Sequence, residues 1–218
     1  MSIQSLLSEL VAFESPCVFN PYNDICEVFD KKNANLIRLN NLELILAELS
    51  RKKVESIWIG RDLGHRGGRR TGLALTDEGS LAFASDLWGV ELQKATKGMA
   101  AYERTAANIW SYVGLIKSNI FMWNVFPFHP HEVDRPFTNR SHTANERDAG
   151  LAILQMVLEI LRPKNIVAIG NDAYRCSLKV YKEDQVFKIR HPSYGGEKDF
   201  ASQISALYGL NDYNSPNT

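Results

Sequence analysis

Short apolar runs alternate with longer amphipathic segments along most of the chain. The apolar runs predict four strands, at residues 54–59, 120–126, 165–170 and 186–189. In the longer segments apolar residues recur every three or four positions, which predicts helices at residues 2–13, 33–53, 105–117, 146–161 and 198–207. Strands that alternate with helices at this spacing favour a parallel sheet with helices on both faces. We therefore predict an α/β fold, a three-layer α/β/α sandwich around a short, mainly four-stranded parallel sheet.

Length and charge narrow the class of protein. The chain has 218 residues, of which 44% are hydrophobic, so it can bury a substantial core, and we expect a single domain. Within it we distinguish a helical amino-terminal part at 1–53, a catalytic α/β core at 54–209 and a flexible tail at 210–218. Basic and acidic residues number 25 each, which leaves no net charge. A polybasic tail is therefore excluded, and binding to nucleic acid would depend on a local patch.

The cysteines and the amino terminus bear on location. Cys17, Cys26 and Cys176 are an odd number at wide spacings, which fits reduced thiols better than a disulfide framework or a zinc site. The first helix lacks the basic region and cleavage site of a signal peptide, and no apolar run reaches the ~18 residues of a membrane helix. We expect a cytoplasmic protein that does not bind membranes.

Polar side chains stand at the ends of three predicted strands. Asp62 follows the first strand and leads into a loop of glycine and arginine, Asn124 lies near the end of the second, and His191 follows the fourth. Because the carboxyl ends of parallel strands share one edge of a sheet, we expect these side chains to converge in one crevice. A carboxylate, an amide and an imidazole suit the cleavage of a bond to a planar heterocycle.

Each of these residues also has a purely structural alternative. Asp62 could cap a turn, Asn124 could satisfy buried backbone groups, and His191 could bond to a carbonyl at a strand end. Residues 77–103 are polar and irregular in pattern. Residues 128–143 contain two prolines, three histidines and two arginines, and we expect an exposed loop there that covers the site.

The residues around these groups resemble the uracil-DNA glycosylases. Gly60-Arg61-Asp62-Leu63-Gly64-His65, followed by Gly68 and by Gly72-Leu73-Ala74-Leu75-Thr76, is similar to that family's water-activating motif, and no gap is needed. His191-Pro192-Ser193 is similar to the family's His-Pro-Ser motif, and Asn124 resembles its base-reading asparagine. The resemblance runs from about residue 54 to residue 207.

A second series of residues is similar in order and spacing to the iron–sulfur branch of the same superfamily. It consists of Asn139-Arg140, Thr143, Glu146, Arg162-Pro163 and residues 166–170. Where that branch carries cluster cysteines, this chain has Phe128 and Gly150, and Cys17 and Cys26 are too far apart for the usual amino-terminal pair. We therefore expect no cluster and no other cofactor or metal.

The resemblance implies a DNA glycosylase that extrudes a pyrimidine nucleotide and hydrolyses its N-glycosidic bond. It makes Asp62 and His191 the catalytic residues: Asp62 stabilises the sugar and orients water, and His191 donates a hydrogen bond to the departing base. Asn124 would read the base. No lysine stands at a catalytic position of the family, so we expect a monofunctional enzyme that leaves an abasic site and acts as a monomer.

The expected base pocket departs from the family pattern. Gly64 stands where the cluster-free enzymes have a tyrosine against the C5 edge of the base, and Leu75 replaces a stacking phenylalanine. The pocket, to which we also assign Arg61, should therefore admit a bulky C5-modified base, for example a hypermodified phage cytosine, with antiviral defence as the role. One alternative is that another side chain fills the space. Another is excision of uracil or mismatched thymine in base-excision repair.

Contacts with DNA are expected from the glycine and arginine loop and from the turn after His191. Arginines there would bind phosphates, and Tyr194 would fill the space left by the extruded base. The predicted DNA-binding residues are His65, Arg66, Arg69, Arg70, Arg140, Ser193, Tyr194 and Gly195.

Three readings from other classes compete with the glycosylase. A metal-dependent hydrolase could use His129 and His131, with Asp62 and His191 nearby, as imidazole and carboxylate ligands. A nucleotide-binding module would use the glycines between Gly60 and Gly72, although neither a Gly-x-Gly-x-x-Gly motif nor a Walker loop fits them. The third is a DNA-binding relative that has lost catalysis.

Overall fold

The computed structural model describes residues 1–210 and contains the predicted parallel sheet. Its strands are β2 (Ser56–Asp62), β3 (Ile120–Phe126), β5 (Asn165–Ile169) and β6 (Val186–Ile189). They lie in the order β3-β2-β5-β6, and each neighbouring pair is parallel. The carboxyl ends of all four strands therefore lie at one edge of the sheet.

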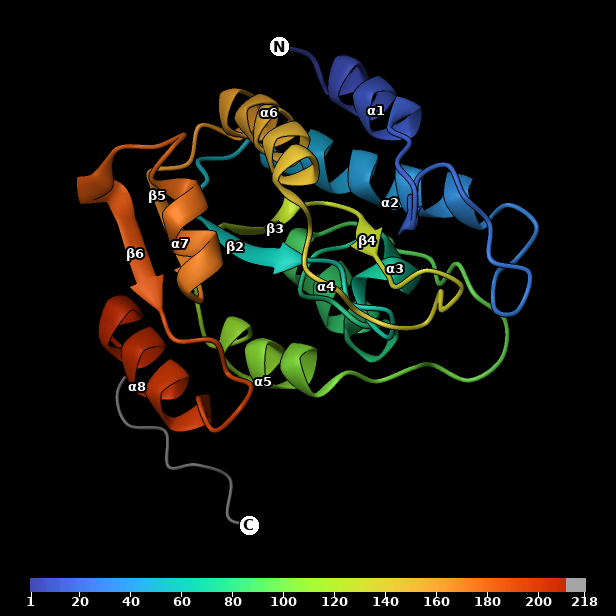
Figure 1. Ribbon diagram of the computed structural model, residues 1–218. Helices are drawn as coiled ribbons and strands as arrows, with labels where there is room; N and C mark the ends of the chain where they lie inside the picture. The colour runs from blue at the N-terminus through green and yellow to red at the C-terminus, as the bar shows by residue number, and fades with distance from the viewer. Residues whose placement is uncertain (211–218) are drawn as a thin grey trace.

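Helices cover both faces of this sheet (Figure 1). α1 (Ile3–Ala12), α2 (Ala34–Leu49) and α6 (Ala144–Leu161) lie on one side, and α5 (Arg104–Val113) and α8 (Glu197–Tyr208) lie on the other. The predicted three-layer α/β/α arrangement is confirmed. The shorter helical elements are α3 (Gly68–Thr71), η1 (Glu78–Ser80), α4 (Leu81–Trp88), α7 (Asn171–Ser177) and η2 (Glu183–Gln185).

The neighbouring strands β2 and β3 form a large part of the hydrophobic core. All of β3 is buried, as are the first five residues of β2. Such continuous burial is typical of a strand with helices on both faces. Trp58 of β2 packs edge-on against Phe200 of α8, and its Nε1 donates to the Tyr208 hydroxyl at 2.7 Å. Sheet and helix are thus joined by apolar and polar contacts.

Local sequence signals explain where α6 begins and ends. Thr143 and Glu146 form a capping box, in which each side chain accepts a hydrogen bond from the other residue's backbone N–H. The helix ends at Leu161 and is capped by Arg162, whose φ is +45°, and Pro163 follows, which cannot continue a helix. α6 therefore begins at Ala144, two residues before the predicted start.

Two regions differ from the prediction. Residues 77–103, which looked irregular, contain η1 and α4, which are too short to show a clear apolar period. Residues 128–143 are exposed only in part, because Phe128 and β4 (His129–Pro130) are buried where β4 pairs with β1 (Val18–Phe19). The prediction of an exposed loop is therefore wrong for the first three residues of that segment.

The predicted tail at 210–218 lies, from residue 211 onward, outside the described residues. No helix within residues 1–210 combines the length and apolar character that crossing a bilayer requires.

Candidate active site

The sheet brings the three strand-end residues to a common edge. Asp62 is the last residue of β2, and Asn124 on β3 stands in register with Gly60 on β2. His191 follows β6 and lies against Gly170 at the end of β5, where an added Cβ would stand 3.5 Å from the His191 Cβ. The predicted convergence of carboxylate, amide and imidazole at one edge of the sheet is therefore present.

Both carboxylate oxygens of Asp62 are held by neighbouring side chains. The Asp62 side chain is 7% exposed, its Oδ2 accepts from Arg61 Nε at 2.7 Å, and its Oδ1 is hydrogen-bonded to His142 Nδ1. Arg61 also lies 3.6 Å from the Asp172 carboxylate at the start of α7. Arg61 was predicted to bind the base, but its contacts in the structure are with these two carboxylates.

His142 is a candidate functional residue that the sequence pattern does not mark. It lies in the loop before α6, and its side chain is almost fully buried beside the ring of Phe126, at a centroid distance of 6.1 Å. The only signal that could have indicated it is its place inside the series from Asn139 to Glu146. That series fixes the loop which brings His142 onto Asp62.

The His191 ring is set up as a neutral hydrogen-bond donor. Its Nδ1 accepts the backbone N–H of Ser193 at 3.2 Å, so the proton of the neutral ring lies on Nε2. Burial lowers the pKa of His191, and the nearby guanidinium groups of Arg61 and Arg190 lower it further. At neutral pH the imidazole therefore carries no charge and offers one N–H.

Asn124 presents an amide without a protein partner. It is 1% exposed, and within residues 1–210 neither its Oδ1 nor its Nδ2 has a hydrogen bond. A Cβ at Gly60 would overlap the Asn124 Oδ1 and come within 2.9 Å of the Leu75 side chain, so only glycine leaves room for both. A buried polar group without a partner costs about 1–3 kcal/mol. The alternative that Asn124 satisfies buried backbone groups is wrong.

Leu75, beside Asn124, has a strained backbone. Its φ is +56°, a backbone angle that residues other than glycine rarely adopt. The Trp110 Nε1 on α5 donates a hydrogen bond to the Leu75 carbonyl at 3.2 Å. Strain of this kind persists where the surrounding structure enforces it, and it occurs often at functional sites.

The space beside Gly64 is not open. A Cβ at Gly64 would lie 2.9 Å from the Glu103 Oε1, and one at Gly67 would overlap the Glu103 Oε2. The Glu103 carboxyl thus occupies the space that the absence of a side chain at Gly64 was expected to leave free. The alternative that another side chain fills this space is therefore correct, and that side chain is Glu103. Nothing in the sequence around Glu103 indicated this position.

Comparison with known proteins identifies the family. Residues 48–204, about 70% of the chain, match the family model of the uracil DNA glycosylase superfamily. The chain belongs to this superfamily. The fold is also similar to that of wild-type SMUG2 from Pedobacter heparinus, with a TM-score of 0.59 and 14% identity over 95% of this chain and 97% of that one. No curated protein matches the chain.

Several of the predicted DNA contacts of this uracil DNA glycosylase superfamily member are accessible. Arg66 is exposed, and the Tyr194 side chain is 99% exposed. Tyr194 and Gly195 have φ values of 54° and 76°, which makes a sharp turn after the half-buried Ser193. His65 is half-buried as well. The turn therefore projects a tyrosine from the edge that carries His191.

Two arginines of the loop after β2 have structural roles in this superfamily member. Arg69 and Arg70 are both buried. The Arg69 guanidinium lies 4.0 Å from the centre of the Phe19 ring, and the Arg70 Nε donates to Glu78 at 3.1 Å. Because neither guanidinium faces solvent, the prediction that they bind DNA phosphates is wrong.

Arg140 also has a structural role. It forms a two-bond pair with Glu146, at 2.7 Å for each bond, and it donates to the carbonyls of His131 and Cys17 at 3.0 and 3.2 Å. Its donors are therefore used to tie together the amino-terminal segment, the loop and α6. This contradicts the prediction of a DNA contact.

The metal-hydrolase alternative finds no site in the part of the chain that the structure describes. His129 is buried, and its Nε2 lies 2.9 Å from the Thr138 carbonyl. Within residues 1–210 no three histidine, cysteine, aspartate or glutamate side chains come together in a way that could hold a metal ion.

His129 should make folding sensitive to mild acid. Burial lowers its pKa to about 3, whereas an unfolded histidine has a pKa of about 6.5, so the unfolded chain binds the extra proton between these values. The contribution of the neutral His129 to the free energy of unfolding is therefore fully present above about pH 6.5. It is lost as the pH falls towards 3, and the loss reaches about 2 kcal/mol at pH 5. Urea unfolding should show that the free energy of unfolding changes less between pH 7 and pH 5 in His129→Gln than in His131→Gln. Equal differences would contradict this.

Proposed function

We propose that this protein is a monofunctional DNA glycosylase that hydrolyses the N-glycosidic bond of an extruded pyrimidine. The observation that carries the proposal is the unpartnered, buried amide of Asn124 at the same sheet edge as Asp62 and a neutral His191. Such an amide is suited to pair with the edge of a base. Membership of the uracil DNA glycosylase superfamily supports the same activity.

The reaction follows from these three groups. A base inside a duplex is inaccessible, so the nucleotide is extruded, which costs a few kcal/mol. As the bond between C1′ and the base nitrogen breaks, its electron pair passes to the base and the sugar gains positive charge, which the Asp62 carboxylate stabilises. A water oxygen then bonds to C1′. The water gives one proton to the Asp62 carboxylate, and the departing base anion takes up a proton from solvent.

Each residue has a defined part in this sequence. Asp62 orients the water, and Arg61 and His142 keep its carboxylate in one orientation. The Nε2–H of His191 donates to the oxygen of the departing base as negative charge develops there. Asn124 can donate from Nδ2 and accept at Oδ1, so it can pair with a cytosine-like or a uracil-like edge.

Product and DNA contacts follow from the surrounding residues. None of the site residues named above is a lysine, so no amine at the site forms a covalent bond to the sugar, and an abasic site remains. Tyr194, fully exposed on its turn, fills the gap left in the duplex, and Arg66 contacts a phosphate. The protein acts as a cytoplasmic monomer.

The substrate that we propose is a pyrimidine with a substituent at C5, as in a hypermodified phage cytosine, and the role is antiviral defence. Leu75, in place of a larger side chain, supports this choice, and the C5 substituent would lie beside Gly64 against the Glu103 carboxyl, which fills the space there. Uracil or mismatched thymine is the alternative substrate.

Duplexes with a single test base decide the function. The protein is incubated with duplexes that contain uracil, a thymine mismatch, 5-hydroxymethylcytosine or glycosylated 5-hydroxymethylcytosine, and alkali-labile abasic sites are scored. We expect release of a C5-substituted cytosine, and none from the double variant Asp62→Asn, His191→Ala. Release from no duplex, or undiminished release by the double variant, would overturn the proposal. Release of uracil alone would overturn only the choice of substrate.

A further inference from the structure

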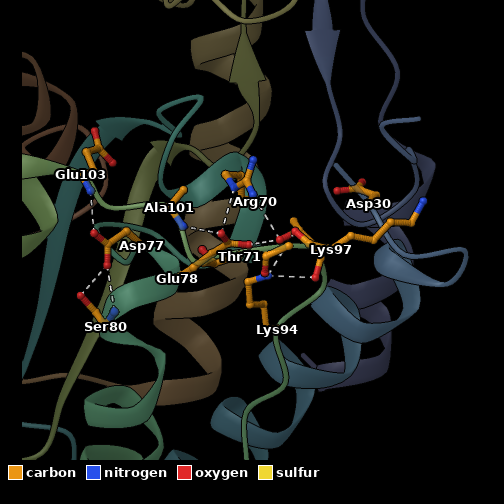
Figure 2. Close-up of polar contacts among 12 residues, drawn as sticks. Asp30, Arg70, Thr71, Asp77, Glu78, Ser80, Lys94, Lys97, Ala101 and Glu103 are labelled. Carbon is orange, nitrogen blue, oxygen red and sulfur yellow. Dashed lines mark hydrogen bonds and ion pairs between the residues drawn. The ribbon is translucent and has the colours of Figure 1, made fainter. Parts of the chain in front are cut away.

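Two buried acids hold Glu103 in place, as Figure 2 shows. The Asp77 Oδ2 accepts the backbone N–H of Glu103 at 2.6 Å, and the Glu78 Oε2 accepts that of Ala101 at 2.8 Å. Asp77 is anchored by Ser80, whose N–H and hydroxyl donate to its Oδ1 at 2.9 and 2.7 Å. The Glu103 carboxylate points away from Asp77. The segment that carries Glu103 is thus fixed at alternate residues.

Glu103 belongs to the rim of the proposed base site. It directly precedes α5, and its carboxyl lies against Gly64 and Gly67 in the loop after β2. Two residues further on, the Thr105 hydroxyl lies 3.1 Å from the Ser193 hydroxyl, which belongs to the turn after His191. The start of α5 therefore stands between the loop that follows Asp62 and the turn that follows His191.

The Glu103 carboxyl has no hydrogen-bond or ion-pair partner among residues 1–210, whereas Asp77 and Glu78 beside it accept several hydrogen bonds each. Burial raises the pKa of Glu103, and the nearby Asp77 carboxylate raises it further, against a smaller lowering by the Arg66 guanidinium. A carboxyl keeps an acceptor oxygen whether or not it is protonated. A ligand group that donates a hydrogen bond can therefore satisfy it in either protonation state.

We propose that Glu103 is a specificity-determining residue that accepts a hydrogen bond from a hydroxyl group on the C5 substituent of the extruded base. This inference rests on the proposed function, which places the C5 substituent beside Gly64. It narrows the substrate from any bulky C5-modified pyrimidine to one whose substituent carries a hydroxyl. A methyl group in the same place would leave the carboxyl without a partner and would be selected against.

The test compares bases that differ by one hydroxyl. Single-turnover release is measured from matched duplexes with 5-methylcytosine or 5-hydroxymethylcytosine, and with the glycosylated derivative of the latter. We expect the wild-type protein to prefer the hydroxyl-bearing bases by about 10- to 100-fold, the usual value of a hydrogen bond to a charged group. Glu103→Met, which removes the acceptor, should bring this ratio near one. Glu103→Gln, which keeps one acceptor oxygen, should retain part of it.

The measured quantity is the ratio of the release rates of the hydroxyl-bearing base and of 5-methylcytosine by one variant. Damage to the fold lowers both rates and leaves this ratio unchanged, whereas loss of recognition changes the ratio. Glu91→Gln, on the exposed part of the same segment, should keep the wild-type ratio. A wild-type protein without a preference for the hydroxyl, or a Glu103→Met variant with the wild-type ratio, would overturn the inference and leave the glycosylase activity in place. If Glu103→Met is insoluble, the wild-type and Glu103→Gln ratios decide. Release from no duplex would overturn the proposed function and this inference with it.

Discussion

Replacing Asp62 with asparagine should lower the rate of base release by about 10²- to 10⁴-fold, the range expected for loss of a group that orients and deprotonates water. Asparagine has the same shape, but it carries no charge to stabilise the sugar as the bond to the base stretches. It also cannot accept from both Arg61 and His142, which the two carboxylate oxygens now do. Single-turnover kinetics on the preferred duplex measure the loss directly.

Asp172 provides the matched control for this experiment. Its carboxylate also pairs with Arg61, at 3.6 Å, but it stands at the start of α7 and is 44% exposed. Asp172→Asn therefore removes one carboxylate from the same guanidinium without touching the end of β2, and it should release base at close to the wild-type rate. If both variants lose activity equally, Asp62 acts only through the local charge and the role that we propose for it fails.

Replacing Glu78 with alanine should lower the free energy of unfolding by about 3–5 kcal/mol, because it leaves a buried guanidinium without its carboxylate. The Glu78 side chain is 1% exposed, and it accepts from Arg70 Nε and the Ala101 N–H (Figure 2). It also accepts from the Thr96 hydroxyl. Thermal unfolding followed by circular dichroism should show a midpoint roughly 10 °C below that of the wild type.

Glu48 offers the contrast for this stability experiment. Its ion pair with Lys52 on the surface of α2 has a distance of 2.8 Å, but solvent screens it, so Glu48→Ala should hardly change the midpoint. A Glu78→Ala variant as stable as Glu48→Ala would mean that Arg70 finds another partner or reaches solvent. The structural role assigned to this arginine would then be wrong.

The sequence was sufficient for the sheet and for the residues at its edge. Four apolar runs predicted β2, β3, β5 and β6, and the alternation with helices predicted that Asp62, Asn124 and His191 would meet. These inferences rest on periodicity and on a general property of parallel sheets, so they need no knowledge of distant contacts.

Residues whose role depends on a distant partner could not be assigned in this way. An arginine in a glycine-rich loop looks the same whether it binds phosphate or an internal acid, and only the fold places Glu78 beside Arg70. His142 and Glu103 lie in segments without apolar periodicity, and their positions next to Asp62 and Gly64 arise from tertiary contacts alone.

The anchoring of Glu103 has a consequence for how this protein can be changed. Asp62 and Asn124 lie on adjacent strands that pack into the core, whereas Glu103 stands on a connecting segment held by its backbone N–H. Its side chain can therefore be exchanged while Asp77 keeps the segment in place. Selection, or a protein engineer, can thus vary the preferred base at residue 103 and leave the hydrolytic chemistry untouched.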